Sequence, residues 1–162
     1  MPLTPGEDDK RLVSSTSICR LSRDEMGQAA LVHRAAFGER VPWLAGLHTP
    51  SEDRAYFRDQ VFPWCDVWGA VDGGLIGFIA FRNGWIDQFY VLPARQRRGV
   101  GEALLEVAKT AHSELHLWTF QWNAPARRFY ENRGFIALEE GDGSGNEERE
   151  PDILYRWQRP AC

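Results

Sequence analysis

Runs of apolar residues predict several short strands in this chain. The segments DVWGAV (66–71) and LIGFIAFR (75–82) flank Asp72-Gly73-Gly74, a combination typical of a β-hairpin. Asn83-Gly84 is a second hairpin signal, and it leads into a strand at 85–92 that Pro93 ends. Shorter runs predict further strands at 18–21, 115–122, 135–138 and 153–157.

Apolar residues at helical spacing predict four helices. The first begins near Asp24 and ends at Gly38, and the second begins at Ser51 and is stopped by Pro63. The third covers about 101–113. The fourth covers 123–133, with Asn123 as its N-cap and Gly134 after its last turn.

The resulting element order is β-α-α-β-β-β-α-β-α-β-β. The strand–helix–strand unit at 85–122 predicts one parallel strand pair, whereas the hairpins predict antiparallel pairs. The predicted fold class is therefore α/β in the broad sense, an α+β arrangement with a single layer of mixed sheet flanked by helices. The length of 162 residues fits one domain at 18–158, with loose tails at 1–17 and 159–162.

Composition and charge narrow the possible partners. The net charge of −4 argues against a dedicated nucleic-acid binder, and no apolar run reaches the ~18 residues needed to span a membrane. The acidic N-terminus does not resemble a signal peptide. Three widely separated cysteines without CxxC spacing predict neither a disulfide framework nor a zinc site. We therefore expect a cytoplasmic protein without a metal cofactor, nucleic-acid partner or membrane partner.

Gln96–Gly101 (QRRGVG) lies between a predicted strand and a predicted helix. Its two glycines allow a tight backbone turn, and the first N–H groups of the helix lack partners within the helix. Together with nearby arginines, these groups predict a cradle for a pyrophosphate. The alternative is a glycine-rich turn with solvated arginines. A dinucleotide-binding loop is excluded by Leu104 at the third glycine position, and a P-loop by Glu102 after Gly101.

A second motif, N-x-x-A-x-x-F-Y-E-x-x-G-F, occupies 123–135, roughly twenty residues after the first motif. This motif and VLPARQRRGVGEALL (91–105), in this order, resemble the GNAT superfamily of N-acetyltransferases. The resemblance extends over about 18–157, and it is loose at 38–66. It implies direct transfer of an acetyl group from acetyl-CoA, a cosubstrate, to a primary amine of a small molecule or peptide. It also implies a possible homodimer, because many relatives dimerise.

The resemblance assigns roles to residues of both motifs. The backbone at the end of the 85–92 strand would pair with the pantetheine arm, the glycine-rich loop would hold the pyrophosphate, and Asn123 would bind pantetheine. The implied cofactor-binding residues are Phe89, Tyr90, Val91, Gln96, Arg97, Arg98, Gly99, Val100, Gly101, Asn123, Phe129 and Tyr130.

Tyr130 is the candidate general acid, because a tyrosine hydroxyl can protonate the departing thiolate. A packing role within an amphipathic helix is the alternative for this residue. For the general base, Asp87 and a water relay both remain open. The four histidines are scattered along the chain, and we expect structural or surface roles for them.

Aromatic and acidic residues predict a site for a cationic amine. In GNAT relatives the first two helices and the last hairpin line the acceptor site. Here the first of these regions contains Trp43, Trp64, Trp68, Glu39, Glu52 and Asp53, and the loop at 139–152 contains seven acidic residues. A solvated loop is the alternative interpretation. Two other functions remain open, a non-catalytic acyl-CoA-binding or sensor module on this fold and an interaction protein with a tryptophan-rich surface.

Overall fold

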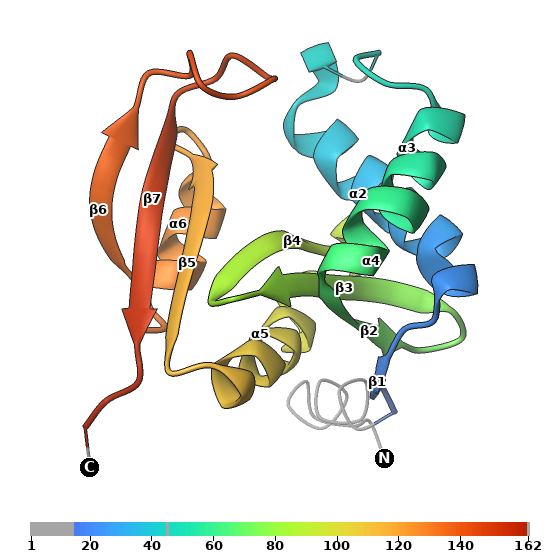
Figure 1. Cartoon of the computed structure of the whole chain (residues 1–162), viewed down its shortest axis with the longest axis horizontal. Coiled ribbons are helices and arrows are strands. Elements are labelled where there is room, and N and C mark those ends of the chain that lie inside the picture. The colour runs from blue at the N-terminus through green and yellow to red at the C-terminus, as the bar shows by residue number, and fades with distance from the viewer. Residues whose placement is uncertain (1–14, 45, 162) are drawn as a thin grey trace, which may run out of the picture. The chain divides into compact units, whose positions relative to one another are not determined.

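The computed structural model describes residues 15–44 and 46–161 (Figure 1). The predicted tail at 1–17 lies mostly outside these residues, and Ser17 already begins the first strand. The strands are β1 (Ser17–Arg20), β2 (Asp66–Val71), β3 (Leu75–Arg82), β4 (Trp85–Val91), β5 (Glu114–Phe120), β6 (Ile136–Gly141) and β7 (Asp152–Gln158). The α-helices are α2 (Met26–Arg40), α3 (Pro50–Tyr56), α4 (Phe62–Trp64), α5 (Val100–Ala111) and α6 (Ala124–Glu131), and the shorter helical turns are η1 (Arg23–Glu25), η2 (Pro42–Leu44), η3 (Phe57–Val61) and η4 (Pro93–Arg95).

The seven strands follow the order β1-β2-β3-β4-β5-β7-β6, which confirms the predicted mixed sheet. The β1–β2, β2–β3, β5–β7 and β6–β7 pairs are antiparallel. β4 and β5 form a parallel pair through Trp85 and His116, as the strand–helix–strand pattern predicts. Among the described residues, no helix is both long enough and apolar enough to cross a bilayer.

The chain divides into two compact units. The first takes in the chain up to Arg82 together with Asp87–Val107, and the second takes in Asn83–Ile86 together with the chain from Ala108 onward. β4 and α5 therefore each contribute residues to both units.

The first unit has a sheet with helices on both faces. Phe78 of β3 belongs to a buried cluster with residues of α2 and η3, including Met26 and Phe57. A Cβ atom added to the neighbouring Gly77 would lie 3.3 Å from Leu104 Cδ1 of α5. Since successive residues of a strand face opposite ways, α2 and α5 lie on opposite faces of β3.

Helix α2 is longer than the sequence predicts. Gly38 was expected to end it, but the helix continues to Arg40, and the Val41 N–H still bonds to the Phe37 carbonyl at 2.9 Å. One glycine within a helix costs only about 1 kcal/mol, which the packing of the helix can offset. Pro42, which has no N–H to donate, follows directly after this last bond.

Pro63 also fails to stop the second predicted helix, which continues as α3, η3 and α4 to Trp64. The residues before it, Phe57–Val61, form a wider π-helical turn. This turn shifts the hydrogen-bonding pattern just ahead of the proline, whose nitrogen cannot donate. The error arose because a regular α-helical pattern was assumed.

The second unit packs α6 against the β5–β7–β6 part of the sheet. Buried Leu115 and Leu117 of β5 and Tyr155 of β7 form its core. Phe135, 2% exposed, follows α6 and packs against the Tyr130 ring at 5.4 Å. The second motif therefore supplies both the helix and part of the core beneath it.

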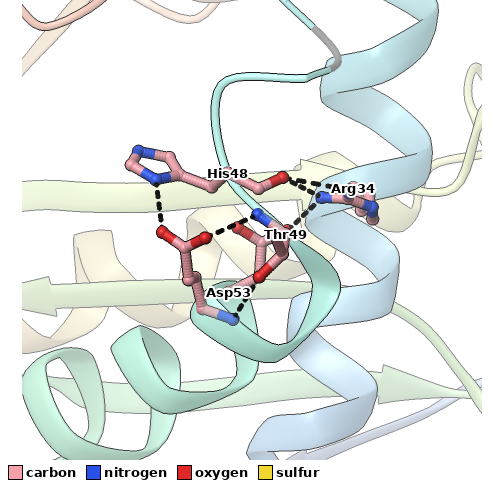
Figure 2. Close-up of polar contacts among 5 residues, drawn as sticks. Arg34, His48, Thr49 and Asp53 are labelled. Carbon is pink, nitrogen blue, oxygen red and sulfur yellow. Dashed lines mark hydrogen bonds and ion pairs between the residues drawn. The ribbon is translucent and has the colours of Figure 1, made fainter.

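A half-buried ion pair connects α2 to the beginning of α3 (Figure 2). Arg34 donates to Asp53 Oδ2 at 2.6 Å through Nη1, and both terminal nitrogens of Arg34 donate to the His48 carbonyl at 3.1 Å. Thr49 and Glu52 form a reciprocal capping box at the start of α3. Asp53 is only 8% exposed, so its carboxylate holds the α2–α3 connection instead of lining an open acceptor site.

We expect Asp53→Asn to lower the free energy of unfolding by about 1.5–3 kcal/mol, because it leaves Arg34 without its anionic partner. Urea unfolding followed by circular dichroism measures this change. Asp59→Asn is the matched control, because Asp59 forms exposed ion pairs with Arg23 and Arg58. Equal effects of the two variants would contradict the role given to Asp53.

Candidate active site

The backbone of the glycine-rich loop has two left-handed residues directly before α5. Arg97 has φ 64° and Gly99 has φ 81°, and α5 begins at Val100. Left-handed residues in a turn can direct successive N–H groups toward one side, which makes a binding site for an anion. The N-terminal end of α5 adds unpaired N–H groups and positive potential. The loop therefore has the backbone geometry of an anion-binding turn, and its binding of a pyrophosphate stays a prediction.

Side chains on both sides hold the segment that leads into this loop. Arg95 forms an ion pair with Asp72 of the β2–β3 turn, with Nη1 and Oδ2 2.7 Å apart. Gln96 Nε2 donates to the Val91 carbonyl at 3.0 Å, and Gln96 Oε1 accepts from Arg40 Nη2 at 3.2 Å. The loop is thus fixed to the hairpin, to β4 and to α2.

The end of β4 lies against an aromatic cluster on the α2 side of the sheet. The Tyr90 ring is 6.0 Å from the Phe78 ring and 4.8 Å from the His33 ring, the latter edge-on. Val91 packs toward the other face, because its Cγ2 atom lies 3.2 Å from the Cβ position of Gly77. The carbonyl of Val91 already accepts the hydrogen bond from Gln96.

Asp87, the candidate base, already has two partners. Its Oδ2 atom accepts from Cys65 Sγ at 3.3 Å and lies 3.4 Å from Arg82 Nε. Burial raises the pKa of the Cys65 thiol to about 12, and the hydrogen bond to Asp87 adds to this rise. The thiol therefore stays protonated at neutral pH and acts as a donor, not as a nucleophile.

His33 of α2 is mostly buried among aromatic rings. It contacts Phe37, Phe57 and Tyr90, with ring centroids 5.3, 5.2 and 4.8 Å away. Its Nδ1 atom is buried and has no hydrogen-bond partner among the described residues. Burial lowers the His33 pKa to about 4, so the imidazole is neutral at physiological pH.

The second unit contains the candidate residues of α6. Asn123 caps the helix as predicted, because its Oδ1 atom accepts from the Ala126 N–H at 3.3 Å. The amide nitrogen of Asn123 is therefore the part that can donate to a ligand. Tyr130, 9% exposed, packs against the rings of Phe129, Phe135 and Tyr155 at 5.4, 5.4 and 6.1 Å.

A hydrogen-bonded network fixes α6 against β7. Arg127 Nε donates to the Tyr155 hydroxyl at 3.0 Å, and this hydroxyl donates to Glu131 Oε1 at 2.9 Å. Arg127 also donates to the Gln121 carbonyl at 3.0 Å. The spacing of four residues between Arg127 and Glu131 places them on one helix face, but the sequence does not show that a tyrosine from β7 lies between them.

The acidic loop after β6 is held by its own hydrogen bonds. Asn146 Nδ2 donates to the Glu150 carbonyl at 2.7 Å and to Asp152 Oδ2 at 3.2 Å. Asp142 Oδ1 accepts from the Ser144 N–H at 2.9 Å. Hydrogen bonding to Ser144, first to its side chain and then to its backbone, lowers the Asp142 pKa. These bonds lie within the loop, most of whose residues are exposed or half-buried, so a solvated loop stays the alternative to a role in acceptor binding.

The structure brings the predicted residues together in two sets. The first unit contains Asp87, Phe89, Tyr90, Val91, Gln96, Arg97, Arg98, Gly99, Val100 and Gly101, and the second contains Asn123, Phe129 and Tyr130. Arg40 was missed, because its contact with Gln96 joins residues 56 positions apart in the sequence. In the part of the chain that the structure describes, no group of three or more His, Cys, Asp or Glu side chains is arranged to hold a metal ion.

Known proteins resemble this chain in sequence and in fold. Residues 63–137, which include the candidate residues of both units, match the family model described as an acetyltransferase (GNAT) domain. The match covers somewhat less than half of the chain, and it is to this segment that the likeness to a GNAT domain applies. One relative, the peptidyl-lysine N-acetyltransferase YiaC of Escherichia coli strain K12, is 38% identical over 65 residues, which cover 40% of this chain and 44% of the relative. The match thus spans less than half of the length of that relative.

Solved structures share the GNAT fold. Apo YjaB from Escherichia coli has a TM-score of 0.73 at 20% identity, over 90% of this chain and 99% of that chain. The PaiA N-acetyltransferase from Thermoplasma acidophilum, solved in complex with coenzyme A, has a TM-score of 0.62 at 20% identity, over 88% of this chain and 98% of that chain. At this identity the likenesses show that the chain shares the fold of these proteins.

The burial of His33 predicts a loss of stability in acid. An unfolded histidine takes up its proton near pH 6.5, whereas folded His33 does so only near pH 4. The free energy of unfolding should therefore fall as the pH drops from about 6.5 to about 4, by at most about 1.4 kcal/mol per pH unit from this residue. Of the charged groups around the ring, Asp53 opposes the pKa shift, while Arg34 and His48 add to it.

His33→Phe should flatten the dependence of stability on pH in this window, because the aromatic contacts remain and the titrating group is lost. Urea unfolding at pH 7, 6, 5 and 4.5 measures this dependence. His48→Asn is the control, because the His48 side chain is 41% exposed. An unchanged acid slope in His33→Phe would contradict the assignment.

Proposed function

We propose that this protein is a GNAT N-acetyltransferase that transfers the acetyl group of acetyl-CoA to a primary amine of a small molecule or peptide. The observation that carries the proposal is the pair of left-handed residues before α5, held in place by Arg95 and Gln96. The relatives support it, since PaiA was solved with coenzyme A and YiaC is a peptidyl-lysine N-acetyltransferase.

In this proposal each part of the site binds one part of acetyl-CoA. The N–H groups of the Arg97–Gly101 loop bind the pyrophosphate, and the Arg97 and Arg98 side chains add positive charge. The backbone of β4 at Phe89–Val91 pairs with the pantetheine arm and the thioester carbonyl. Asn123 donates its amide N–H groups to the pantetheine arm, because its oxygen already caps α6.

The proposed reaction needs an uncharged amine. The amine nitrogen forms a bond to the thioester carbon, and the bond between that carbon and sulfur breaks. Backbone N–H groups stabilise the negative charge that develops on the carbonyl oxygen. The Tyr130 hydroxyl protonates the departing thiolate. The rings packed around Tyr130 hold this side chain in one place, so its packing role and its proposed chemical role are compatible.

For the proton of the amine, Asp87 and a water relay remain the two routes. Asp87 Oδ2 is already bonded to Cys65 and Arg82, so a direct role in proton transfer falls to Oδ1. Asp87 is 37% exposed at its side chain, so water can reach it in either case.

Binding of acetyl-CoA is the first test of this function. In thermal unfolding, a ligand at about 100 times its Kd should stabilise the folded protein by about 2.7 kcal/mol. Gly99→Glu should abolish the rise in Tm, because it adds a negative charge and a side chain at φ 81°. Tyr130→Phe should keep the rise in Tm but lower kcat by about 10²-fold or more.

Gly73→Glu is the matched control for Gly99→Glu. Gly73 is also left-handed, with φ 68°, but it lies in the β2–β3 turn, and a Cβ atom there meets no other atom within 4 Å. The Gly73→Glu variant should therefore bind acetyl-CoA like the wild-type protein. No rise in Tm for the wild-type protein would refute the proposal, whereas a rise without turnover of any amine would favour an acyl-CoA sensor.

The acidic loop provides a test of the acceptor class. If the acceptor is cationic, replacing Glu147, Glu148 and Glu150 together with Gln should raise its KM about tenfold and leave the KM for acetyl-CoA unchanged. A lysine-containing basic peptide and spermidine serve as probes. The wild-type KM for the acceptor should also rise with salt, and this rise should be smaller in the variant. An unchanged acceptor KM would remove the loop from acceptor recognition.

A further inference from the structure

A chain of three groups extends from α2 to β4 through the residue that precedes the left-handed turn. Arg40, the last residue of α2, donates to Gln96 Oε1 at 3.2 Å, and Gln96 Nε2 donates to the Val91 carbonyl at 3.0 Å. The Arg40–Gln96 contact joins residues 56 positions apart in the sequence. Arg40 lies outside the two sequence motifs.

We infer that Arg40 is a positioning residue for acetyl-CoA, which acts through Gln96 to hold the glycine-rich loop in its binding conformation. This inference rests on the proposed function, because it assigns to Arg40 a role in the same cofactor site. It adds a residue from the first long helix to a site built from β4, the loop and α5.

The donor and acceptor groups of Arg40 and Gln96 fix the orientation of the Gln96 amide in this bridge from Arg40 through Gln96 to the Val91 carbonyl. A guanidinium group only donates hydrogen bonds, so it fixes the Gln96 amide with its oxygen toward Arg40. The NH₂ group of Gln96 then points to the Val91 carbonyl, which can only accept. Without Arg40, rotation of the amide would place either its oxygen or its nitrogen near the Val91 carbonyl, and only one of these two orientations makes a bond.

The position of Gln96 matters because Arg97, the next residue, has φ 64°. A side chain with a Cβ atom is disfavoured in this region, so surrounding contacts must hold Arg97 there. Arg95 is fixed by Asp72, and Gln96 is fixed by Val91 and Arg40. Loss of the Arg40 contact should let the loop populate other conformations, which reduces the fraction of protein that is ready to bind.

The test compares acetyl-CoA binding by calorimetry in the wild-type protein, Arg40→Met, Gln96→Leu and the double variant. We expect each single variant to raise the Kd about tenfold, which corresponds to one charge-assisted hydrogen bond. The double variant should be no weaker than the weaker single variant, because both substitutions break the same bridge. Arg40→Lys keeps a donor and should retain most of the affinity.

Arg23→Met is the matched control, because it removes one positive charge and one exposed ion pair, with Asp59, from the same unit. It should leave the Kd unchanged. In Arg40→Met the KM for acetyl-CoA should rise while kcat at saturation stays the same, and amide hydrogen exchange at 94–99 should become faster without ligand. A general loss of structure would instead lower kcat and affect exchange throughout the unit.

The outcomes separate this inference from the proposed function. If the wild-type protein binds acetyl-CoA and Arg40→Met binds equally well, the role of Arg40 is refuted and the function stands. Additive losses in the double variant would also refute it, because they would show that Arg40 acts without Gln96, for example by touching a phosphate directly. If the wild-type protein does not bind acetyl-CoA, both proposals are refuted.

Discussion

The first unit depends on a backbone constraint at the start of α5. Two residues, Arg97 and Gly99, take left-handed φ values within three positions, and a helix begins at the next one. Glycine adopts this conformation freely, but for an arginine it costs roughly 1 kcal/mol or more. The contacts of Arg95 and Gln96 with the hairpin, with β4 and with α2 provide the forces that keep this conformation. The rest of the unit therefore maintains the conformation of the loop.

Helix α2 takes part in maintaining this loop conformation. Its apolar residues, among them Met26 and Ala29, belong to the buried cluster beneath the helix. Two of its arginines contact different parts of the unit. Arg34 holds the start of α3 through Asp53, and Arg40 reaches the glycine-rich loop. One helix therefore contacts both the α2–α3 connection and the loop proposed to bind the cofactor.

Local patterns in the sequence were enough to predict most of the fold. β2 and β3 have the predicted boundaries, because their apolar runs end at turn residues such as Asp72 and Asn83. The Asn123 cap and the loop before α5 were also predicted, because each motif lies within one short segment. The helix ends at Gly38 and Pro63 were wrong, because packing and a π-helical turn offset the preference of a single residue.

Contacts between distant segments could not be read from the sequence. Asp53 was expected to face a cationic acceptor, since an acidic residue near tryptophans suits one, but its partner is Arg34. Two other sets of contacts were missed for the same reason, because each depends on how elements pack in three dimensions. They are the hydrogen bonds among Arg127, Tyr155 and Glu131 and the hydrogen bond from Arg40 to Gln96. In both units the motif residues contact the ligand in our proposal, and residues outside the motifs hold them. In our proposal, a substitution outside the motifs, such as one at Arg40, therefore also lowers cofactor affinity.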